Sequence, residues 1–226
     1  MTANAGLPDI LVTGTDTGVG KTVVAAALVL ARRERGLRVV GFKPVETGLA
    51  DGAPSDVAIL AAATGTSDVP EPLLQLGEPL APAVAADRAG VALDTNALEQ
   101  RVRDLRRAGC SVVLEGAGGV LVPLAWGYTA ADIAARMGLD AVIVARAGLG
   151  TLNHTQLTVL ALRARGVAVH AVVLNGRGDP PDLAESTNPG ALARLLPGVR
   201  VVVVPRHATR DPLEAARRSV PYLDGL

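Results

Sequence analysis

Gly14-Thr15-Asp16-Thr17-Gly18-Val19-Gly20-Lys21-Thr22 follows an apolar run, Ile10 to Val12, and precedes a helix-forming run, Val23 to Arg35. A strand, a glycine-rich loop and a helix in this order place a nest of backbone N–H groups at a helix N-terminus, where phosphates bind. In such a loop Lys21 reaches the terminal phosphates and the Thr22 hydroxyl faces a magnesium ion. The first glycine of the usual spacing is missing, because Thr15 holds its position and Gly14 lies one residue too early. The stretch predicts a nucleotide-phosphate site; the alternative is a glycine-rich helix entry without a ligand.

Apolar runs of strand length recur along the chain and alternate with helical segments. Several of the runs lack apolar–polar alternation, which is typical of strands buried on both faces of a parallel sheet. The expected strands are Ile10–Thr13, Arg38–Phe42, Ser111–Leu114, Ala141–Ala145, Val169–Leu174 and Val199–Val204. The expected helices are Lys21–Arg35, Val57–Ala63, Thr95–Ala108, Ala130–Met137, Thr151–Arg165, Gly190–Leu195 and Asp211–Arg218. This order predicts one α/β domain over residues 1–226, with a doubly wound, mostly parallel sheet of six to seven strands between helices.

Two segments have no clear periodicity and are expected to be irregular. Leu49–Ser55 is rich in Ala, Asp, Gly and Pro, and Asp68–Gly90 contains four prolines. A long loop in a compact domain is usually functional or a lid. A surface excursion without a function is the alternative, and the sequence leaves both open.

Composition excludes some classes of protein. The 226 residues include 22 basic and 22 acidic side chains, so the net charge is zero and a general nucleic-acid binder is not expected. The single cysteine, Cys110, cannot form an internal disulfide, which favours a reducing compartment. The N-terminus lacks a basic region followed by an apolar one, and no window reaches the about 18 apolar residues of a membrane span. We therefore expect a cytoplasmic protein without a membrane partner.

Polar residues follow the second and third expected strands, at the edge where ligands of such sheets bind. Lys43, fixed by Pro44, is a suitable cation for an anionic substrate, and Thr47 lies close enough in sequence to donate to the same anion. Glu115 ends a buried strand, where a carboxylate needs a cation partner, and magnesium is the usual one in a phosphate-binding sheet. A solvent-exposed lysine and an ordinary salt bridge are the alternatives for Lys43 and Glu115.

Three further positions are ambiguous from sequence. Asp56 precedes a helical run and is either its N-cap or a ligand. Asn175 carries an amide that can read the edge of a nucleobase, but before Gly176 it is also a common turn residue. The glycine-containing loop Gly148–Asn153 opens a helix whose free N–H groups are able to bind a carboxylate.

Taken in order, Gly14–Thr22, Lys43–Gly48, Glu115–Gly119 and Gly150–His154 resemble the dethiobiotin synthetase family of P-loop NTPases over the whole chain. The resemblance implies ATP- and Mg²⁺-dependent closure of a ureido ring on 7,8-diaminopelargonate with CO2, in biotin biosynthesis. It implies a carbamate and a carbamic-phosphoric anhydride as intermediates. Family members are homodimers, and the loop Gly150–Asn153 is expected to reach the neighbouring subunit's substrate.

The resemblance also assigns roles to residues. Lys21 and Lys43 are the catalytic cations, and Thr22, Asp56 and Glu115 are the magnesium ligands. The residues implied for nucleotide binding are Gly18, Val19, Gly20, Lys21, Thr22, Val23, Asp56, Glu115, Gly116, Ala117, Gly118, Asn175, Gly176, Val204, Pro205 and Arg206. Those implied for the substrate are Thr17, Lys43, Thr47, Gly150 and Asn153.

Two rival functions belong to the same superfamily. A partitioning-type nucleotide switch carries an extra lysine near the start of its phosphate loop, but Asp16 holds that place here. An amidotransferase-type ligase carries a glutaminase domain, for which this chain is too short. The residues near Asn175 give no firm preference for ATP over other nucleoside triphosphates.

Overall fold

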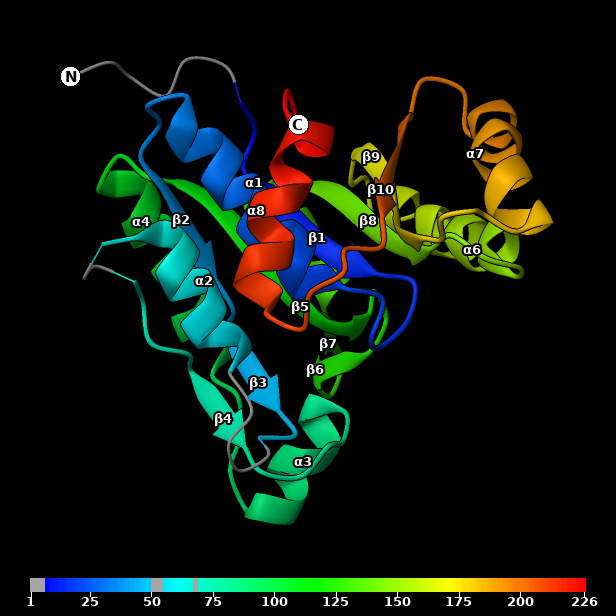
Figure 1. Cartoon of the computed structure of the whole chain (residues 1–226). Coiled ribbons are helices and arrows are strands. Elements are labelled where there is room, and N and C mark those ends of the chain that lie inside the picture. Colours follow the sequence, from blue (N-terminus) through cyan, green and yellow to red (C-terminus); the bar gives the residue numbers. More distant parts are fainter. Residues whose placement is uncertain (1–6, 50–54, 67–68) are drawn as a thin grey trace.

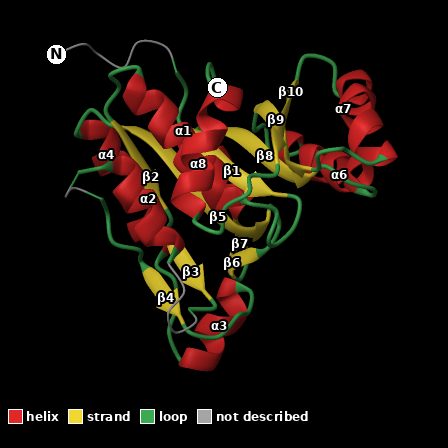
Figure 2. Ribbon diagram, viewed as in Figure 1, coloured by secondary structure: helices red, strands yellow, loops and turns green. Residues whose placement is uncertain are grey.

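The core of the protein is a six-stranded parallel sheet (Figures 1 and 2). The structure is a computed structural model that describes residues 7–49, 55–66 and 69–226. The sheet has the strand order β10-β9-β8-β1-β5-β2. Its strands are β1 (Ile10–Gly14), β2 (Val39–Phe42), β5 (Ser111–Gly119), β8 (Asp140–Arg146), β9 (Val169–Arg177) and β10 (Arg200–Pro205). The predicted doubly wound α/β fold is confirmed, with six strands in the central sheet.

Helices cover both faces of the sheet because alternate strand residues point to opposite sides. On one face α1 (Lys21–Glu34), α2 (Asp56–Thr64) and α8 (Pro212–Leu223) pack on side chains such as Ile10 and Val12. On the other face the strands present Leu11, Leu114 and Ile143 to a second core. The helices of this face are α4 (Thr95–Arg107), α5 (Ala130–Met137), α6 (Thr151–Arg163) and α7 (Leu183–Leu195).

The strand register brings three distant segments to one edge of the sheet. Val12 of β1 pairs with Glu115 of β5, and Phe42 of β2 pairs with Leu114. The phosphate loop and Lys43 therefore follow the carboxyl ends of β1 and β2, beside Glu115, which lies within β5. This is the edge at which the sequence predicts the ligand site.

A small lobe extends from this edge, at the bottom of Figure 1. It contains the parallel pair β3 (Val45–Thr47) and β4 (Leu74–Leu76), the antiparallel pair β6 (Pro123–Ala125) and β7 (Tyr128–Thr129), and helix α3 (Pro82–Ala89). The expectation that Asp68–Gly90 is irregular throughout was wrong, because β4 and α3 lie in it. Pro82 opens α3 at its first turn, where a missing N–H costs nothing.

Some element boundaries also differ from the expected ones. Helix α7 begins at Leu183 rather than Gly190, because Asp182 and Glu185 form a reciprocal capping box and Pro189 lies within the helix. Helix α8 has Asp211 as its N-cap, as the Asp-Pro pair predicts, and continues to Leu223. Most of the predicted loop Leu49–Ser55 lies outside the described residues. In the described part of the chain, no helix is both long enough and apolar enough to cross a membrane.

Candidate functional site

Glycines give the phosphate loop its shape. Gly18 and Gly20 have φ angles of 72° and 92°, in the left-handed region that favours glycine. A Cβ on Gly20 would lie 2.1 Å from the Asn175 side-chain nitrogen, and one on Gly14 would lie 2.7 Å from the Asp16 carbonyl oxygen. Gly14 is therefore needed for close packing of the loop, although it stands one residue outside the usual spacing.

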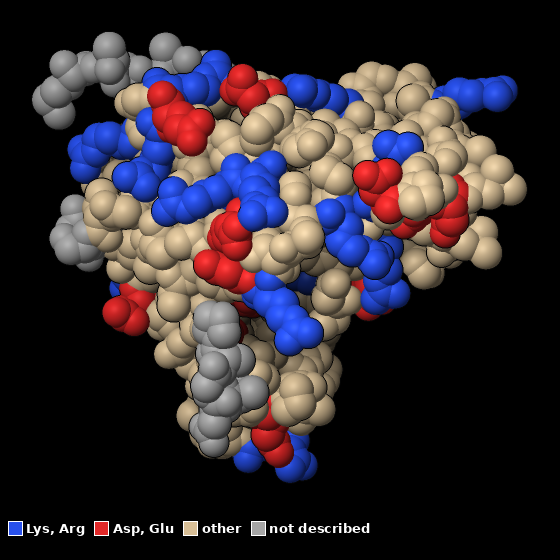
Figure 3. Space-filling model, viewed as in Figure 1, with Lys and Arg blue, Asp and Glu red and all other residues tan. Residues whose placement is uncertain are grey.

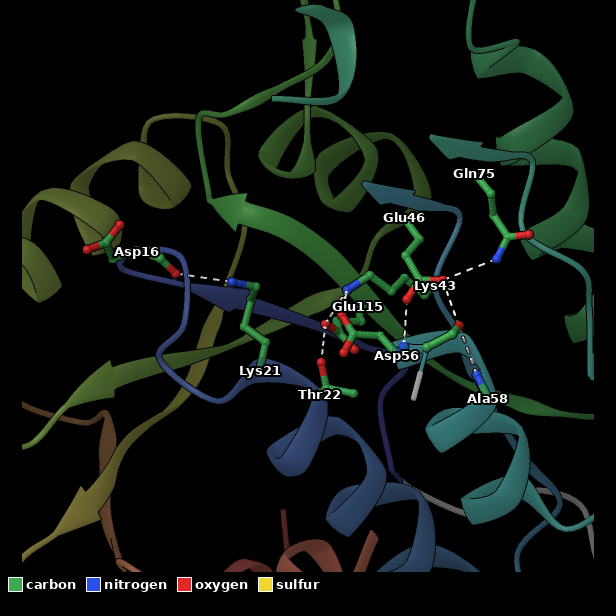
Figure 4. Close-up of polar contacts among 10 residues, drawn as sticks. Asp16, Lys21, Thr22, Lys43, Glu46, Asp56, Ala58, Gln75 and Glu115 are labelled. Carbon is green, nitrogen blue, oxygen red and sulfur yellow. Dashed lines mark hydrogen bonds and ion pairs between the residues drawn. The ribbon is translucent and has the colours of Figure 1, made fainter. Parts of the chain in front are cut away.

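Lys21 is the first residue of α1, and its side chain is buried beside the loop. Its ammonium donates to the Asp16 carbonyl oxygen at 3.1 Å and so folds back over the loop (Figure 4). Burial lowers the pKa of Lys21, and Glu115 partly opposes this effect. The exposed Asp16 carboxylate accepts from Arg146 at 3.0 Å, a contact that braces the loop from the end of β8. Arg146 was not predicted from the sequence, because no local pattern links it to the phosphate loop.

Lys43 lies between two carboxylates at the centre of the site (Figure 4). Its ammonium donates to Glu115 Oε1 at 2.8 Å and to Asp56 Oδ2. Thr22 Oγ1 donates to the same Glu115 oxygen at 2.9 Å. Burial acts to lower the pKa of Lys43, but the two carboxylates outweigh it and raise the pKa above its usual range. Burial also raises the pKa of Glu115, and Lys43 opposes that rise.

A cavity of about 370 Å³ opens beside these groups. The predicted site residues that line it are Thr17, Gly18, Gly20, Lys21, Thr22, Val23, Lys43, Thr47, Asp56, Glu115, Ala117 and Gly118. Val45, Ile59 and Pro212 also line it and were not predicted. Pro212 comes from the start of α8, so the C-terminal part of the chain closes one side of the cavity. The sequence pattern of α8 did not predict that Pro212 contacts the cavity.

Asp56 does not cap a helix, so that interpretation was wrong. Ser55 is the N-cap of α2, and Asp56 is the first helical residue. The backbone N–H of Asp56 donates to Glu46 Oε1 at 2.6 Å, which leaves its carboxylate directed at Lys43. Glu46 was not predicted to contribute to the site, although it lies in the same short segment as Lys43 and Thr47.

Of the residues predicted for the nucleobase, Asn175 lies against Val19 and Gly20 of the phosphate loop. Asn175 is within β9 rather than in a turn, and its amide nitrogen donates to the Val19 carbonyl at 3.0 Å. Gly176 follows it with a φ angle of 78°. Val204 is fully buried in the core, while Arg206 is exposed and its N–H donates to the Arg177 carbonyl at 2.8 Å. These residues, with Val19, Gly116 and Pro205, do not line the 370 Å³ cavity.

The second glycine loop lies apart from that cavity. Gly150 is the N-cap of α6 with a φ angle of 91°, and Asn153 is exposed in the first turn. Leu149 beside them is 95% exposed. The structure therefore does not bring Gly150 and Asn153 to the lysines within one chain.

The donor set around Glu115 fits a magnesium ion better than a metal held by protein alone. Glu115 Oε2 is buried and accepts no hydrogen bond from any described residue. The described residues contain no cluster of three or more His, Cys, Asp or Glu side chains that could hold a metal. Magnesium usually takes one or two carboxylates together with phosphates and water, which Thr22, Asp56, Glu115 and a bound nucleotide can supply.

Basic and acidic side chains lie near one another over the face of the molecule seen in Figure 3. The three ion-paired or hydrogen-bonded charges of the site, Lys43, Glu115 and Asp56, are instead concentrated at the cavity. With Lys21, the cavity is lined by two lysines and two carboxylates, so its formal charge is balanced within the protein.

Comparisons with known proteins agree with this geometry. Residues 9–212 match a family model described as an AAA domain. An ATP-dependent dethiobiotin synthetase of Anaeromyxobacter dehalogenans (strain 2CP-1 / ATCC BAA-258) is 49% identical over 191 residues, which are 82% of this chain and 84% of that protein. The enzyme of the same name from Mycobacterium bovis (strain ATCC BAA-935 / AF2122/97) is 42% identical over 217 residues, 95% of each chain.

A solved structure shares the fold. The MinC:MinD cell division protein complex of Aquifex aeolicus aligns with a TM-score of 0.58 over 95% of this chain and 87% of that chain. The sequences are 15% identical, so this likeness concerns the fold alone.

Proposed function

This chain belongs to the family of ATP-dependent dethiobiotin synthetases, and we propose that it closes the ureido ring of dethiobiotin from 7,8-diaminopelargonate and CO2. The observation that carries the proposal is the meeting of Lys21, Lys43 and Thr22 with two carboxylates around one cavity beside the phosphate loop. The enzyme is then an ATP-dependent ligase of biotin biosynthesis. A nucleotide-switch function is not favoured, since the two relatives that are 49% and 42% identical to this chain are both named as synthetases.

The reaction has three covalent steps. One substrate amine adds to CO2 and loses a proton, which gives a carbamate. A carbamate oxygen attacks the γ-phosphorus of ATP, and ADP leaves as a carbamic-phosphoric anhydride forms. The second amine then attacks the carbamoyl carbon, the ring closes, and phosphate leaves while the amine loses a proton. Little acid–base catalysis is needed, so the protein contributes alignment and charge neutralisation.

The two lysines would supply that neutralisation. Lys21, which donates to the Asp16 carbonyl, can exchange this contact for the β- and γ-phosphate oxygens without leaving the loop. Lys43 is held by Glu115 and Asp56, which also keep its ammonium charged, and it faces the cavity where the carbamate would lie. Holding a charge in place before the reaction avoids reorganisation during it. Thr17 and Thr47, which both line the cavity, would contact the substrate.

Magnesium would be held by Thr22, Asp56 and Glu115. The buried Glu115 Oε2, which has no partner among the described residues, supports this assignment. When bound, the ion would neutralise the charge that develops on the phosphate oxygens. The protein's own part is to hold the Thr22 hydroxyl against Glu115 and both carboxylates against Lys43.

A homodimer would complete the substrate site. Leu121, Leu149, Leu157 and Leu160 are between 52% and 95% exposed, and a second cavity of about 420 Å³ lies between the segment after β5 and α6. Apolar side chains gathered on one face favour a protein partner, and symmetric dimers are the commonest assemblies. Pairing of these faces would bring Gly150 and Asn153 to the neighbouring subunit, where their polar groups would bind the substrate carboxylate.

The nucleobase would lie near Asn175, Gly176 and the segment Val204–Arg206. One N–H of the Asn175 amide is engaged by the Val19 carbonyl, so the second N–H and the carbonyl oxygen are the groups available to a base. Such an amide can pair with the edge of adenine, which both donates and accepts, but by itself it does not select adenine. A cytoplasmic location, where ATP and the substrates occur, belongs to the same proposal.

One experiment tests the function. Purified protein is incubated with 7,8-diaminopelargonate, isotopically labelled bicarbonate, Mg²⁺ and each nucleoside triphosphate in turn. We expect labelled dethiobiotin in the mass spectrum, and nucleoside diphosphate in equal amount. Absence of the ring-closed product with every triphosphate, from a folded protein, would overturn the proposal.

A further inference from the structure

Glu46 is a buried carboxylate whose two oxygens accept hydrogen bonds from three donors. Its side chain is only 5% exposed, and no described Lys or Arg side chain forms an ion pair with it. Oε1 accepts from the Asp56 backbone N–H at 2.6 Å. Oε2 accepts from Ser55 Oγ at 2.7 Å and from Gln75 Nε2 at 3.2 Å. A buried charge with this many short hydrogen bonds is held in one position.

The position of Glu46 stabilises the start of α2. Ser55 is the N-cap, but its contact with the Ala58 N–H is long, at 3.4 Å. Glu46 adds a second acceptor for the orphan N–H groups of the first turn, and its negative charge lies at the positive end of the helix dipole. The first turn of α2, and with it Asp56, is therefore fixed to β3.

Glu46 and Lys43 hold the same residue from two sides. Lys43 contacts the Asp56 carboxylate, while Glu46 contacts the Asp56 backbone (Figure 4). Both belong to the short segment that leaves β2 and forms β3. The distance between Lys43 and Asp56 is thus set by a closed loop of contacts rather than by one ion pair.

Gln75 extends these contacts into the small lobe. It pairs with Glu46 in the register of β3 and β4, and its amide donates to the Glu46 carboxylate. Thr47, the residue after Glu46, lines the cavity. The small lobe and the proposed magnesium ligand are therefore joined through one side chain.

We propose that Glu46 is a positioning residue that presents Asp56 to magnesium and to Lys43. The inference rests on the proposed function in one respect, because it takes Asp56 as a magnesium ligand. Residues that orient a metal ligand typically change metal affinity or activity by about 10- to 100-fold when they are removed.

The test compares Glu46→Ala, Glu46→Gln and Glu46→Asp with the wild type and with Glu34→Ala, a change on the exposed surface of α1. The readout is the Mg²⁺ concentration that gives half-maximal binding of a non-hydrolysable ATP analogue, measured by calorimetry. We expect this midpoint to rise about tenfold or more in Glu46→Ala. Glu46→Gln keeps an acceptor for the Asp56 N–H and should return the midpoint to within about threefold of the wild type, while Glu34→Ala should leave it unchanged.

An unchanged midpoint in a folded Glu46→Ala protein would overturn the inference. If Glu46→Ala fails to fold, Glu46→Asp carries the test, because it keeps the charge but is one methylene too short to reach Asp56. We then expect a severalfold rise, and a wild-type midpoint would overturn the inference. Dethiobiotin formation by the wild type is measured separately, so a failure of the proposed function is distinguished from a failure of the role given to Glu46.

Discussion

Two glycine loops open helices at the same edge of the sheet, and in each the N-cap glycine has a left-handed φ angle. Gly20 precedes α1 with a φ angle of 92°, and Gly150 precedes α6 with a φ angle of 91°. Neither helix has a side-chain N-cap hydrogen bond, so both offer free N–H groups to an anion. Their surroundings differ. The first loop is bordered by buried Lys21, Lys43 and Glu115, whereas the second carries the almost fully exposed Leu149.

The difference shows that a helix N-terminus becomes a site through its neighbours. The ends of β2 and β5 complete the first loop within one chain. The second loop is fixed from behind, since the Asn188 amide donates to the carbonyls of Ala147 and Gly148 at 2.7 and 3.0 Å. Its outer side is open. We therefore expect the first loop to bind its ligand in every subunit, and the second to act only across a dimer.

The largest expected effect comes from removing Lys43, the cation that lies beside the first loop. Lys43→Ala should bind nucleotide but lose at least about 100-fold in kcat, the scale for a preorganised charge-stabilising donor. Ring closure is measured by product mass. Because the variant leaves two carboxylates facing each other without a cation, thermal unfolding is measured as a control for loss of stability. Turnover close to the wild type would remove the catalytic role of Lys43.

Replacing the carboxylate tests the proposed metal ligand. Glu115→Gln keeps the volume of a side chain that is 1% exposed but removes its charge. The Mg²⁺ concentration for half-maximal activity should rise at least about 10-fold, because even the loss of a group that orients a metal ligand typically costs about 10- to 100-fold. A magnesium titration that superimposes on that of the wild type would contradict the assignment.

A matched pair of alanine substitutions compares the loops directly. Both Gly20→Ala and Gly150→Ala place a Cβ at a left-handed φ, which costs about 1–2 kcal/mol. Only at Gly20 would the Cβ also meet Asn175, at 2.1 Å, whereas at Gly150 the nearest atom is 4.0 Å away. ATP affinity, measured by calorimetry, should fall about tenfold in Gly20→Ala and stay unchanged in Gly150→Ala. Equal losses in the two variants would mean that the loops share one site.

The smallest effect is expected at the second loop. It tests whether this loop acts in the site of the neighbouring subunit. Asn153→Ala should raise the KM for diaminopelargonate about three- to tenfold, the scale of one lost hydrogen bond. In mixed dimers of an Asn153→Ala subunit with a Lys43→Ala subunit, the site with an intact Lys43 receives the partner's intact Asn153, so the remaining turnover should have the wild-type KM. Kinetics that equal the sum of two independent subunits would confine Asn153 to its own chain.

Local contacts were predictable because they join neighbours in sequence. The phosphate loop and the Asp-Pro entry of α8 fall into this group, and so does the helix that begins beside Asp56. Even there an error of one residue occurred, since Ser55 rather than Asp56 is the N-cap. Strand positions were predictable from buried apolar runs, but the short strands β3 and β4 were not, because three residues carry too little pattern.

The sequence by itself determined the parallel sheet and the phosphate-binding loop, since apolar periodicity and the backbone geometry of consecutive residues require no distant partner. Only the tertiary structure decided that Thr22 and Lys43 meet at one oxygen of Glu115, across 93 and 72 residues of chain. It alone placed Glu46 behind Asp56, Arg146 on the loop and Pro212 at the cavity. Such contacts depend on strand order and helix packing, which a one-dimensional pattern does not specify.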